Sequence, residues 1–330
     1  IELISKFAGG ILSVSAGLSL GREGPSVQIG SYVGCLVSRW THILKGERKQ
    51  LLAAGAGAGL AAAFAAPLAS SLIVIESIER FDAPKTAITT LLAGVVAGVI
   101  ATLVFPVNPY HLIEVSEPAL AFWVQMKYFL ILAVIISIVG KLYAAIMISF
   151  KRVYSAVKSP TSVKMFYLVL VAYIISLMQV NLTGGGEQFL LEQAQNGSTE
   201  MMWVLAVMLL HFGFSVCSVS SGLPGGNFIP TLVTGGLLGR FVGLIAVKYG
   251  IIGQESVTYV MLISMSAFLV AIERTPLTAI VLITEITGHF EVFYPSVVVG
   301  GLTYYFTELL QMKSFNVILY EDMVSSSDFQ

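Results

Sequence analysis

An arginine and a glutamate stand side by side in an otherwise apolar stretch of the chain. Arg22 and Glu23 lie between two glycines, Gly21 and Gly24, and directly before Pro25. A proline in the first turn of a helix costs no hydrogen bond, and neighbouring glycines let the backbone turn and approach a ligand closely. The stretch therefore predicts a helix start, whose free N–H groups and positive dipole end suit an anion.

A carboxylate at an anion site is explained if it competes with the anion. Ionised, Glu23 would occupy and block the site; protonated, or displaced by a permeating ion, it would swing away. Burial and a neighbouring anion both favour the protonated form of a carboxylate, and ionisable groups inside membranes often mark ion and proton pathways. We predict that Glu23 is a gate and proton carrier. The alternatives are a buried Arg22–Glu23 ion pair or a glutamate that faces water.

The glycine and proline spacing of residues 21–25 recurs at residues 226–230, which read Gly-Asn-Phe-Ile-Pro and precede another apolar, glycine-containing segment. Two further segments also match, because residues 67–76 and 276–285 each begin with Pro-Leu and end with glutamate. We therefore expect two related halves, an arrangement common among transporters. A helix start inside a membrane is tolerated only where protein or a cavity surrounds it, so the two starts are expected to converge.

The composition places these elements in a membrane. Hydrophobic residues make up 56% of the 330 residues and charged residues 11%, against about 25% charged in soluble domains. Apolar runs near the length of a span recur through the whole chain, so we expect an all-α, integral, multi-pass membrane protein, in the cell membrane if it is prokaryotic. The net charge of −1 provides no basic field for nucleic acid. The runs lie near residues 5–20, 51–75, 86–105, 121–150, 163–180, 201–219, 227–249, 257–272, 276–286 and 292–310.

Three stretches, GREGPSVQIG, GNFIP after SSGLPG, and AAAFAAPLASSLIVIE, together resemble the CLC family of chloride channels and chloride/proton exchangers. The resemblance implies an inverted repeat of tilted and re-entrant helices, and a homodimer with a separate pore in each subunit. It divides the chain into residues 1–120, the latter part of the first half, and residues 121–330, the second half with a short C-terminal helix. It also implies that residues before Ile1 are missing.

The resemblance assigns roles to residues of both glycine–proline stretches. Glu23 matches the external gating glutamate, and Arg22 matches an arginine that adds positive potential near the outer vestibule. The external anion is expected on the backbone amides around Gly24, Phe228 and Ile229, and the central anion on those of Asn227 and Phe228. Chloride is thus a transported ligand, and no cofactor, metal site or catalytic residue is predicted.

The chain departs from the family pattern at two points that bear on selectivity and coupling. The family's serine-containing stretch lies upstream of Gly21 and is absent here, which leaves chloride, fluoride and nitrate open as the preferred anion. Family exchangers carry a proton-transfer glutamate directly after the position of Glu76, where this chain has Ser77. A serine hydroxyl does not ionise near neutral pH, so exchange with protons by the usual route is in question. Glu76 itself points about 100° away from Ser77 on a helix.

A third departure concerns the family's central tyrosine, which lies in a short helix after the last span. Direct register of MKSFNVILYEDM places Asn316 there, and a slip of one helical turn places Tyr320. We prefer Asn316, whose amide donates to chloride but closes the pathway less bulkily than a phenol. The expected partners are chloride, protons, the lipid bilayer and a second copy of the chain.

Other polar residues receive less specific interpretations. Gly17-Leu-Ser-Leu-Gly21 matches a serine-hydrolase pattern, so an intramembrane hydrolase that uses Ser19 is the competing hypothesis, although the preceding run is helical. His211 is interpreted as a helix-packing residue. Glu273 and Arg274 precede a proline and are expected to form a local ion pair at a helix end. Glu285 is expected at a helix end or interface.

Overall fold

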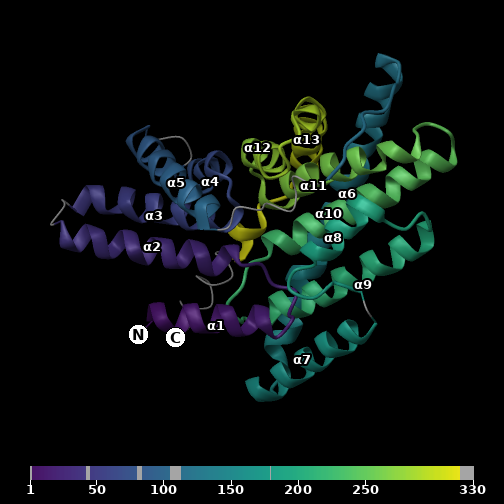
Figure 1. The fold of residues 1–330 in the computed structure, drawn as a ribbon. Helices are drawn as coiled ribbons and strands as arrows, with labels where there is room; N and C mark the ends of the chain where they lie inside the picture. Colours follow the sequence, from purple (N-terminus) through teal and green to yellow (C-terminus); the bar gives the residue numbers. More distant parts are fainter. Residues whose placement is uncertain (1, 42–44, 80–83, 105–112, 179, 320–330) are drawn as a thin grey trace.

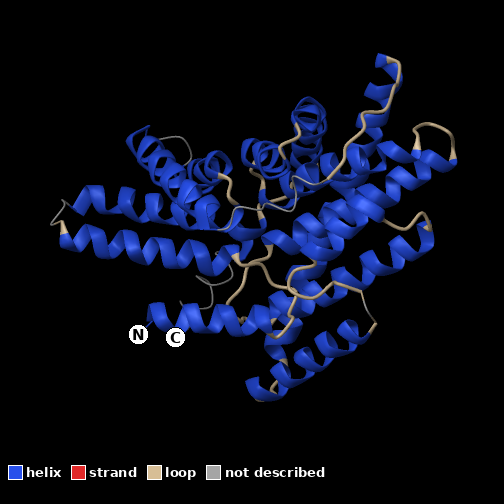
Figure 2. Cartoon of the chain, viewed as in Figure 1, coloured by secondary structure: helices blue, strands red, loops and turns tan. Residues whose placement is uncertain are grey.

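The computed structural model describes residues 2–41, 45–79, 84–104, 113–178 and 180–319, and every regular element among them is helical (Figures 1 and 2). This agrees with the predicted all-α fold. The labelled α-helices are α1 (Glu2–Ser15), α2 (Glu23–Trp40), α3 (Lys45–Phe64), α4 (Pro67–Val74), α5 (Pro84–Val104), α6 (Phe122–Ala156), α7 (Thr161–Leu177), α8 (Glu187–Asn196), α9 (Met201–Ser220), α10 (Phe228–Lys248), α11 (Val257–Glu273), α12 (Pro276–Thr287) and α13 (Phe293–Leu309). A π-helical turn η1 (Ile75–Glu79) and two 3-10 turns, η3 (Gln254–Ser256) and η4 (Phe290–Val292), are also present, and residues 315–319 are helical as well.

Five of the described helical segments are long and apolar enough to cross a membrane. They are α5, α6, α9, α10 and residues 254–273, which contain α11. Helix α11 is buried along its whole length, and α10 nearly so. A helix that is apolar all round belongs in the interior, and α10 and α11 pack against each other there. In contrast, α5 exposes most of its apolar side chains, as expected of a helix that faces lipid.

The apolar run at residues 51–75 is two helices, not the single span that the composition suggested. Helix α3 ends at Phe64 and α4 begins at Pro67, with Ala65 between them at a φ of 52°. The residue before a proline is driven out of the helical conformation, which forces the break. The second half breaks in the same way, because Arg274 has a φ of 62° two residues before Pro276.

The two predicted helix starts meet in the structure. Gly21 and Gly226 exchange backbone hydrogen bonds in an antiparallel bridge, and both N···O distances are 2.8 Å. Helix α2 begins two residues after Gly21, and α10 begins two residues after Gly226. The loops before the two helices cross near the centre of the molecule (Figure 2). The repeat therefore places one helix N-terminus from each half at a common point.

Each half also caps a helix of the other half. The Glu76 carboxylate accepts hydrogen bonds from the Leu277 and Thr278 amides at 3.0 and 2.8 Å, at the start of α12. The Glu285 carboxylate accepts from the Leu68 and Ala69 amides at 3.0 and 2.8 Å, at the start of α4. Glu285 thus lies at an interface between helices, as the sequence predicted.

Candidate anion site where two helix starts meet

The Glu23 carboxylate lies on the backbone amides that begin α10. Its Oε1 accepts hydrogen bonds from the Phe228 amide at 2.8 Å and from the Ile229 amide at 3.4 Å. The residue is 5% exposed, and its Oε2 is buried with no hydrogen-bond partner among the described residues. A negatively charged group here is stabilised by unpaired N–H donors and by the helix dipole.

Glycines make room for this carboxylate. A side chain at Gly21 or Gly226 would meet the Glu23 carboxylate, and a side chain at Gly24 would press on the backbone of residues 225–226. The bridge between the two glycines thus sets the distance between the two helix starts. The backbone of both halves approaches the anionic group closely because no Cβ intervenes.

Arg22 does not neutralise Glu23. Its guanidinium pairs with Glu187, with Nη2 3.2 Å from Oε1, and its side chain is 52% exposed. The local Arg22–Glu23 ion pair that the sequence left as an alternative is therefore absent from the described contacts. Glu187 interacts electrostatically with Glu23 as well as pairing with Arg22.

A cavity of about 320 Å³ opens beside Glu23 and extends between the two halves. It contains four of the predicted site residues together with Ser77 and Asn316, the two described candidates for its other end. Its lining residues are Glu23, Gly24, Val27, Gln28, Ala56, Leu60, Ile73, Val74, Ser77, Gly226, Asn227, Phe228, Glu273 and Asn316. Tyr320, the alternative to Asn316, lies outside the described residues.

Glu273 is a site residue that the sequence analysis missed. It lines this cavity, is 7% exposed, and interacts electrostatically with Glu23. Its Oε2 accepts a hydrogen bond of 2.5 Å from the Asn316 amide group. The expected ion pair with Arg274 was wrong, because the left-handed backbone of Arg274 turns that side chain away.

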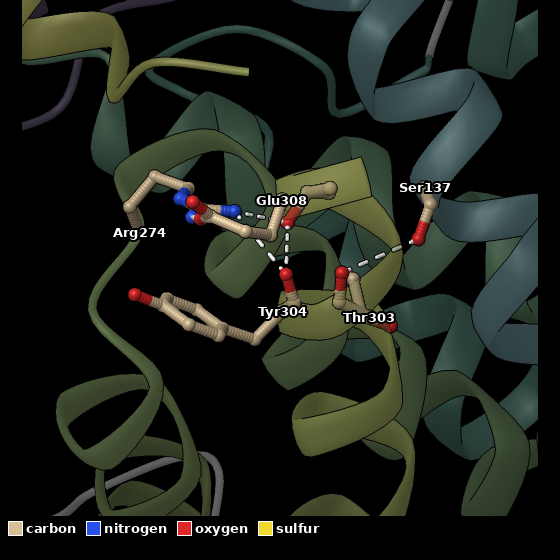
Figure 3. Close-up of polar contacts among 6 residues, drawn as sticks. Ser137, Arg274, Thr303, Tyr304 and Glu308 are labelled. Atoms are coloured by element: carbon tan, nitrogen blue, oxygen red, sulfur yellow. Dashed lines mark hydrogen bonds and ion pairs between the residues drawn. The ribbon is translucent and has the colours of Figure 1, made fainter. Parts of the chain in front are cut away.

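Arg274 is held by α13 instead (Figure 3). Its guanidinium pairs with Glu308, donates to the Thr307 hydroxyl at 2.5 Å, and lies 4.2 Å from the centre of the Tyr304 ring. Three kinds of contact on one helix hold this cation, so it does not pair with Glu273.

Tyr143 orients the side chain of Asn227. The Tyr143 hydroxyl donates to Asn227 Oδ1 at 3.1 Å, which fixes the direction of the amide group. The Asn227 Nδ2 is buried and has no hydrogen-bond partner within the described part of the chain. It is a free donor on a cavity-lining residue, close to the amides that hold Glu23. No local motif marks Tyr143, which lies 84 residues before Asn227.

A model of the voltage-gated chloride channel family matches residues 1–308 of this chain. The chain belongs to that family. It is 31% identical over 305 residues to the H⁺/Cl⁻ exchange transporter ClcA of Cronobacter sakazakii, covering 89% of this chain and 64% of the relative. The chain thus spans just under two thirds of the length of that curated relative.

Solved structures agree with the membership of this chloride channel family. The structure of a slow cyanobacterial Cl⁻/H⁺ antiporter matches with a TM-score of 0.89 and 26% identity, covering 99% of this chain and 77% of the antiporter. A CLC-type fluoride/proton antiporter matches with a TM-score of 0.76 and 22% identity, covering 92% of this chain and 73% of that one. The predicted CLC-type fold and the integral, multi-pass membrane location are therefore confirmed.

The family is one of channels and transporters, which leaves the serine-hydrolase hypothesis without support. Ser19 is fully buried, and its hydroxyl lies 2.7 Å from that of Ser215. The Ser215 hydroxyl in turn lies 3.4 Å from His211 Nε2. Ser19 is not among the residues that line the cavity beside Glu23.

The structure also separates Glu76 from Ser77. Ser77 lines the cavity, whereas the Glu76 carboxylate accepts from two backbone amides and from the Thr278 hydroxyl at the start of α12. Glu76 is committed to that helix start and is not among the residues that line the cavity. It therefore does not substitute for the carboxylate that Ser77 lacks.

Proposed function

We propose that the protein carries chloride across the membrane and that Glu23 gates the pathway. The observation that supports this is the contact of the Glu23 carboxylate with the Phe228 and Ile229 amides, because donors that hold a carboxylate also suit a halide. The similar Cronobacter sakazakii protein is named as an exchanger of chloride and protons. The amides near Gly24 and Asn227 extend the same donor surface along the cavity.

The mechanism is a competition between the side chain and the ion. While Glu23 is ionised it occupies the amides and excludes chloride. Protonation removes the charge that the amides and the helix dipole attract, so the side chain leaves and the anion replaces it. Backbone dipoles bind a dehydrated anion without a full positive charge at the site, which lets the ion leave again.

The proposal is tested by replacing Glu23 with glutamine in protein reconstituted into liposomes. In the natural protein, chloride efflux is expected to rise as the pH falls, because protonation frees the amides. Glu23→Gln cannot ionise, so its chloride efflux is expected to lose the pH dependence and its proton movement to fall at least tenfold. Efflux is measured with a chloride electrode and proton movement with a pH electrode.

The exposed Glu255 supplies the matched control, since Glu255→Gln removes a carboxyl far from the cavity and should leave both quantities unchanged. A Glu23→Gln protein with the pH dependence of the natural protein would contradict the gating role. Absence of anion efflux from the natural protein would contradict the function itself. Repeating the efflux with nitrate and fluoride ranks the anions.

A further inference from the structure

We propose that the protein binds an anionic phospholipid in a pocket between α6, α7 and α9, with an acyl chain in the pocket and the phosphate at its basic rim. This pocket shares no lining residue with the cavity beside Glu23. The inference does not depend on the proposed transport function, because the quantity that tests it is lipid binding. Three observations on the described residues support it.

The first observation is the pocket itself, which has a volume of about 340 Å³. It lies where the C-terminal end of α6, the first half of α7 and the last turn of α9 meet, and Figure 1 shows α7 beside α9. Four aliphatic side chains and two tyrosine rings form most of its wall, namely Val157, Val163, Leu168, Val171, Tyr154 and Tyr167. Such a wall suits a hydrocarbon chain and gives water few hydrogen-bond partners.

The second observation is that the pocket opens on a face of α7 that suits lipid. Val163, Tyr167 and Val171 line the pocket and are themselves exposed, and their spacing of four residues places them on one helix face. The neighbouring Phe166 and Leu170 are exposed as well. Helices α6 and α9 are each long and apolar enough to cross a membrane. Exposed apolar side chains between such helices contact the acyl chains of the bilayer, so the molecule nearest to this pocket is a lipid.

The third observation is a concentration of positive charge at the same end of these helices. Four basic residues lie within fourteen positions around the turn between α6 and α7, namely Lys151, Arg152, Lys158 and Lys164. The sequence has no acidic residue between positions 117 and 187, although the net charge of the chain is −1. Basic clusters at a membrane surface attract anionic headgroups. A zwitterionic headgroup brings a cation of its own and gains less from such a cluster.

Lys164 joins this charge to the pocket. It lines the pocket, donates to the Tyr154 carbonyl at 2.9 Å, and lies 4.7 Å from the centre of the Tyr154 ring. That carbonyl is among the last four of α6, which lack a partner within the helix. An ammonium group has three N–H donors and this bond uses one, so donors remain for phosphate oxygens. Tyrosine rings gather at the depth of the headgroups, which places Lys164 at the level of the phosphate.

The test titrates the intact protein in detergent with phospholipid and follows binding by native mass spectrometry. We expect phosphatidylglycerol to bind more tightly than phosphatidylcholine with the same acyl chains. Replacing Lys158 and Lys164 together by glutamine should weaken phosphatidylglycerol binding about tenfold, because each basic residue adds to the attraction, and should leave phosphatidylcholine binding unchanged. Lys164→Arg keeps the charge and should keep most of the affinity.

The matched control for charge replaces Lys85 and Lys127 together by glutamine. Both lysines are exposed and neither lines the pocket. Lys127 lies about 36 Å from Lys151 along α6, at a rise of about 1.5 Å per residue. This variant should bind phosphatidylglycerol as the natural protein does.

A further variant tests the acyl-chain part of the site. Val171→Trp fills the pocket and should weaken phosphatidylglycerol binding with all four basic residues in place. Leu170→Trp adds the same ring at the neighbouring exposed position, which does not line the pocket, and is its control. Glycerol phosphate carries the charged group without acyl chains and should not displace the lipid.

A measurement on the natural protein uses phosphatidylglycerol with a photoreactive group in one acyl chain. We expect mass spectrometry to place the label between residues 154 and 171 or at Cys217. A phosphatidylcholine probe with the same chain should label these residues less.

Equal binding of the two phospholipids, or unchanged phosphatidylglycerol binding in the double glutamine variant, would overturn the role of the basic rim. Displacement of the lipid by glycerol phosphate would overturn the role of the pocket. Label confined to other helices would overturn the site, and this is the result expected if a second protein chain covers it.

Discussion

Single residues at the meeting point of the two halves act by being small or by being acidic. Gly21 and Gly226 bond to each other through their backbones, and neither has a side chain that would displace the Glu23 carboxylate. Glu23 then fills the space that those glycines leave. Because the glycines leave this space, the Phe228 and Ile229 amides can either hold the Glu23 carboxylate or, once it leaves, be free for an anion.

Gly226→Ala tests this fit at the residue scale. The added methyl group meets the Glu23 side chain, so we expect the carboxylate to leave the Phe228 amide and anion efflux at neutral pH to rise several-fold. In a Glu23→Ala background the methyl group has room, and the same substitution should change efflux much less, a non-additivity expected of residues in contact. Efflux from liposomes measures both.

Gly301→Ala is the control for that pair, because a Cβ there has no neighbour within 4 Å. Additive effects of Gly226→Ala and Glu23→Ala would mean that the methyl group acts elsewhere.

At the scale of elements, helix starts determine the architecture of the site. Proline sets where α4 and α12 begin, and a glutamate from the opposite half accepts hydrogen bonds from their first amides. The starts of α2 and α10 lack such a structural cap and instead share Glu23. Two helix starts are therefore closed by fixed acids, and the N-terminus of α10 is closed by an acid that we propose to be movable.

Glu285→Gln is predicted to destabilise the protein without uncoupling it. The change removes a charge-assisted bond to two amides of α4, which costs about 1–3 kcal/mol. After heating in detergent, we expect half of the monodisperse size-exclusion peak to be lost at a lower temperature than in the natural protein. The ratio of protons to chloride ions moved should be unchanged at 25 °C. Glu76→Gln should behave alike, since it caps α12 in the same way.

The exposed Glu255→Gln serves as the reference for thermal stability. A fall in the proton movement of Glu76→Gln comparable to that expected of Glu23→Gln would contradict the assignment of Glu76 to a helix cap.

At the scale of the whole molecule, the two halves of the chain meet at the site. The contact that holds Glu23 on the Phe228 amide joins residues 205 positions apart in the sequence. The homodimer that the family resemblance implies stays a prediction. In such an assembly each subunit would carry its own pathway.

This predicts independent subunits in mixed assemblies. We expect proton movement to fall in proportion to the fraction of Glu23→Gln subunits, when natural and variant chains are combined in known amounts before reconstitution. The physical reason is that both helix starts that meet at Glu23 come from the same chain. Chemical cross-linking before the transport measurement establishes whether dimers are present, and a steeper than linear loss would contradict the independence.

Local chemistry explains which features of the fold and of the candidate site could be predicted from the sequence. Proline and glycine act on their own backbone and on the next residues, so the starts of α2 and α10, the repeat and the acid between two glycines were all predictable. The break between α3 and α4 was also encoded, by Pro67, but the apolar composition of residues 51–75 concealed it. The resemblance to a known family added roles to these residues.

The sequence by itself thus determined a helical membrane protein of two related halves with Glu23 at a helix start. Only the tertiary structure decided which groups face that residue. Glu273 was expected to form a helix-end ion pair because Arg274 follows it. Pro276 indicated the end of the helix, but only the structure shows that Arg274 pairs with Glu308 instead. The direction of a side chain at a helix end depends on how that helix packs against distant helices, and such packing joins residues too far apart for sequence spacing to reveal.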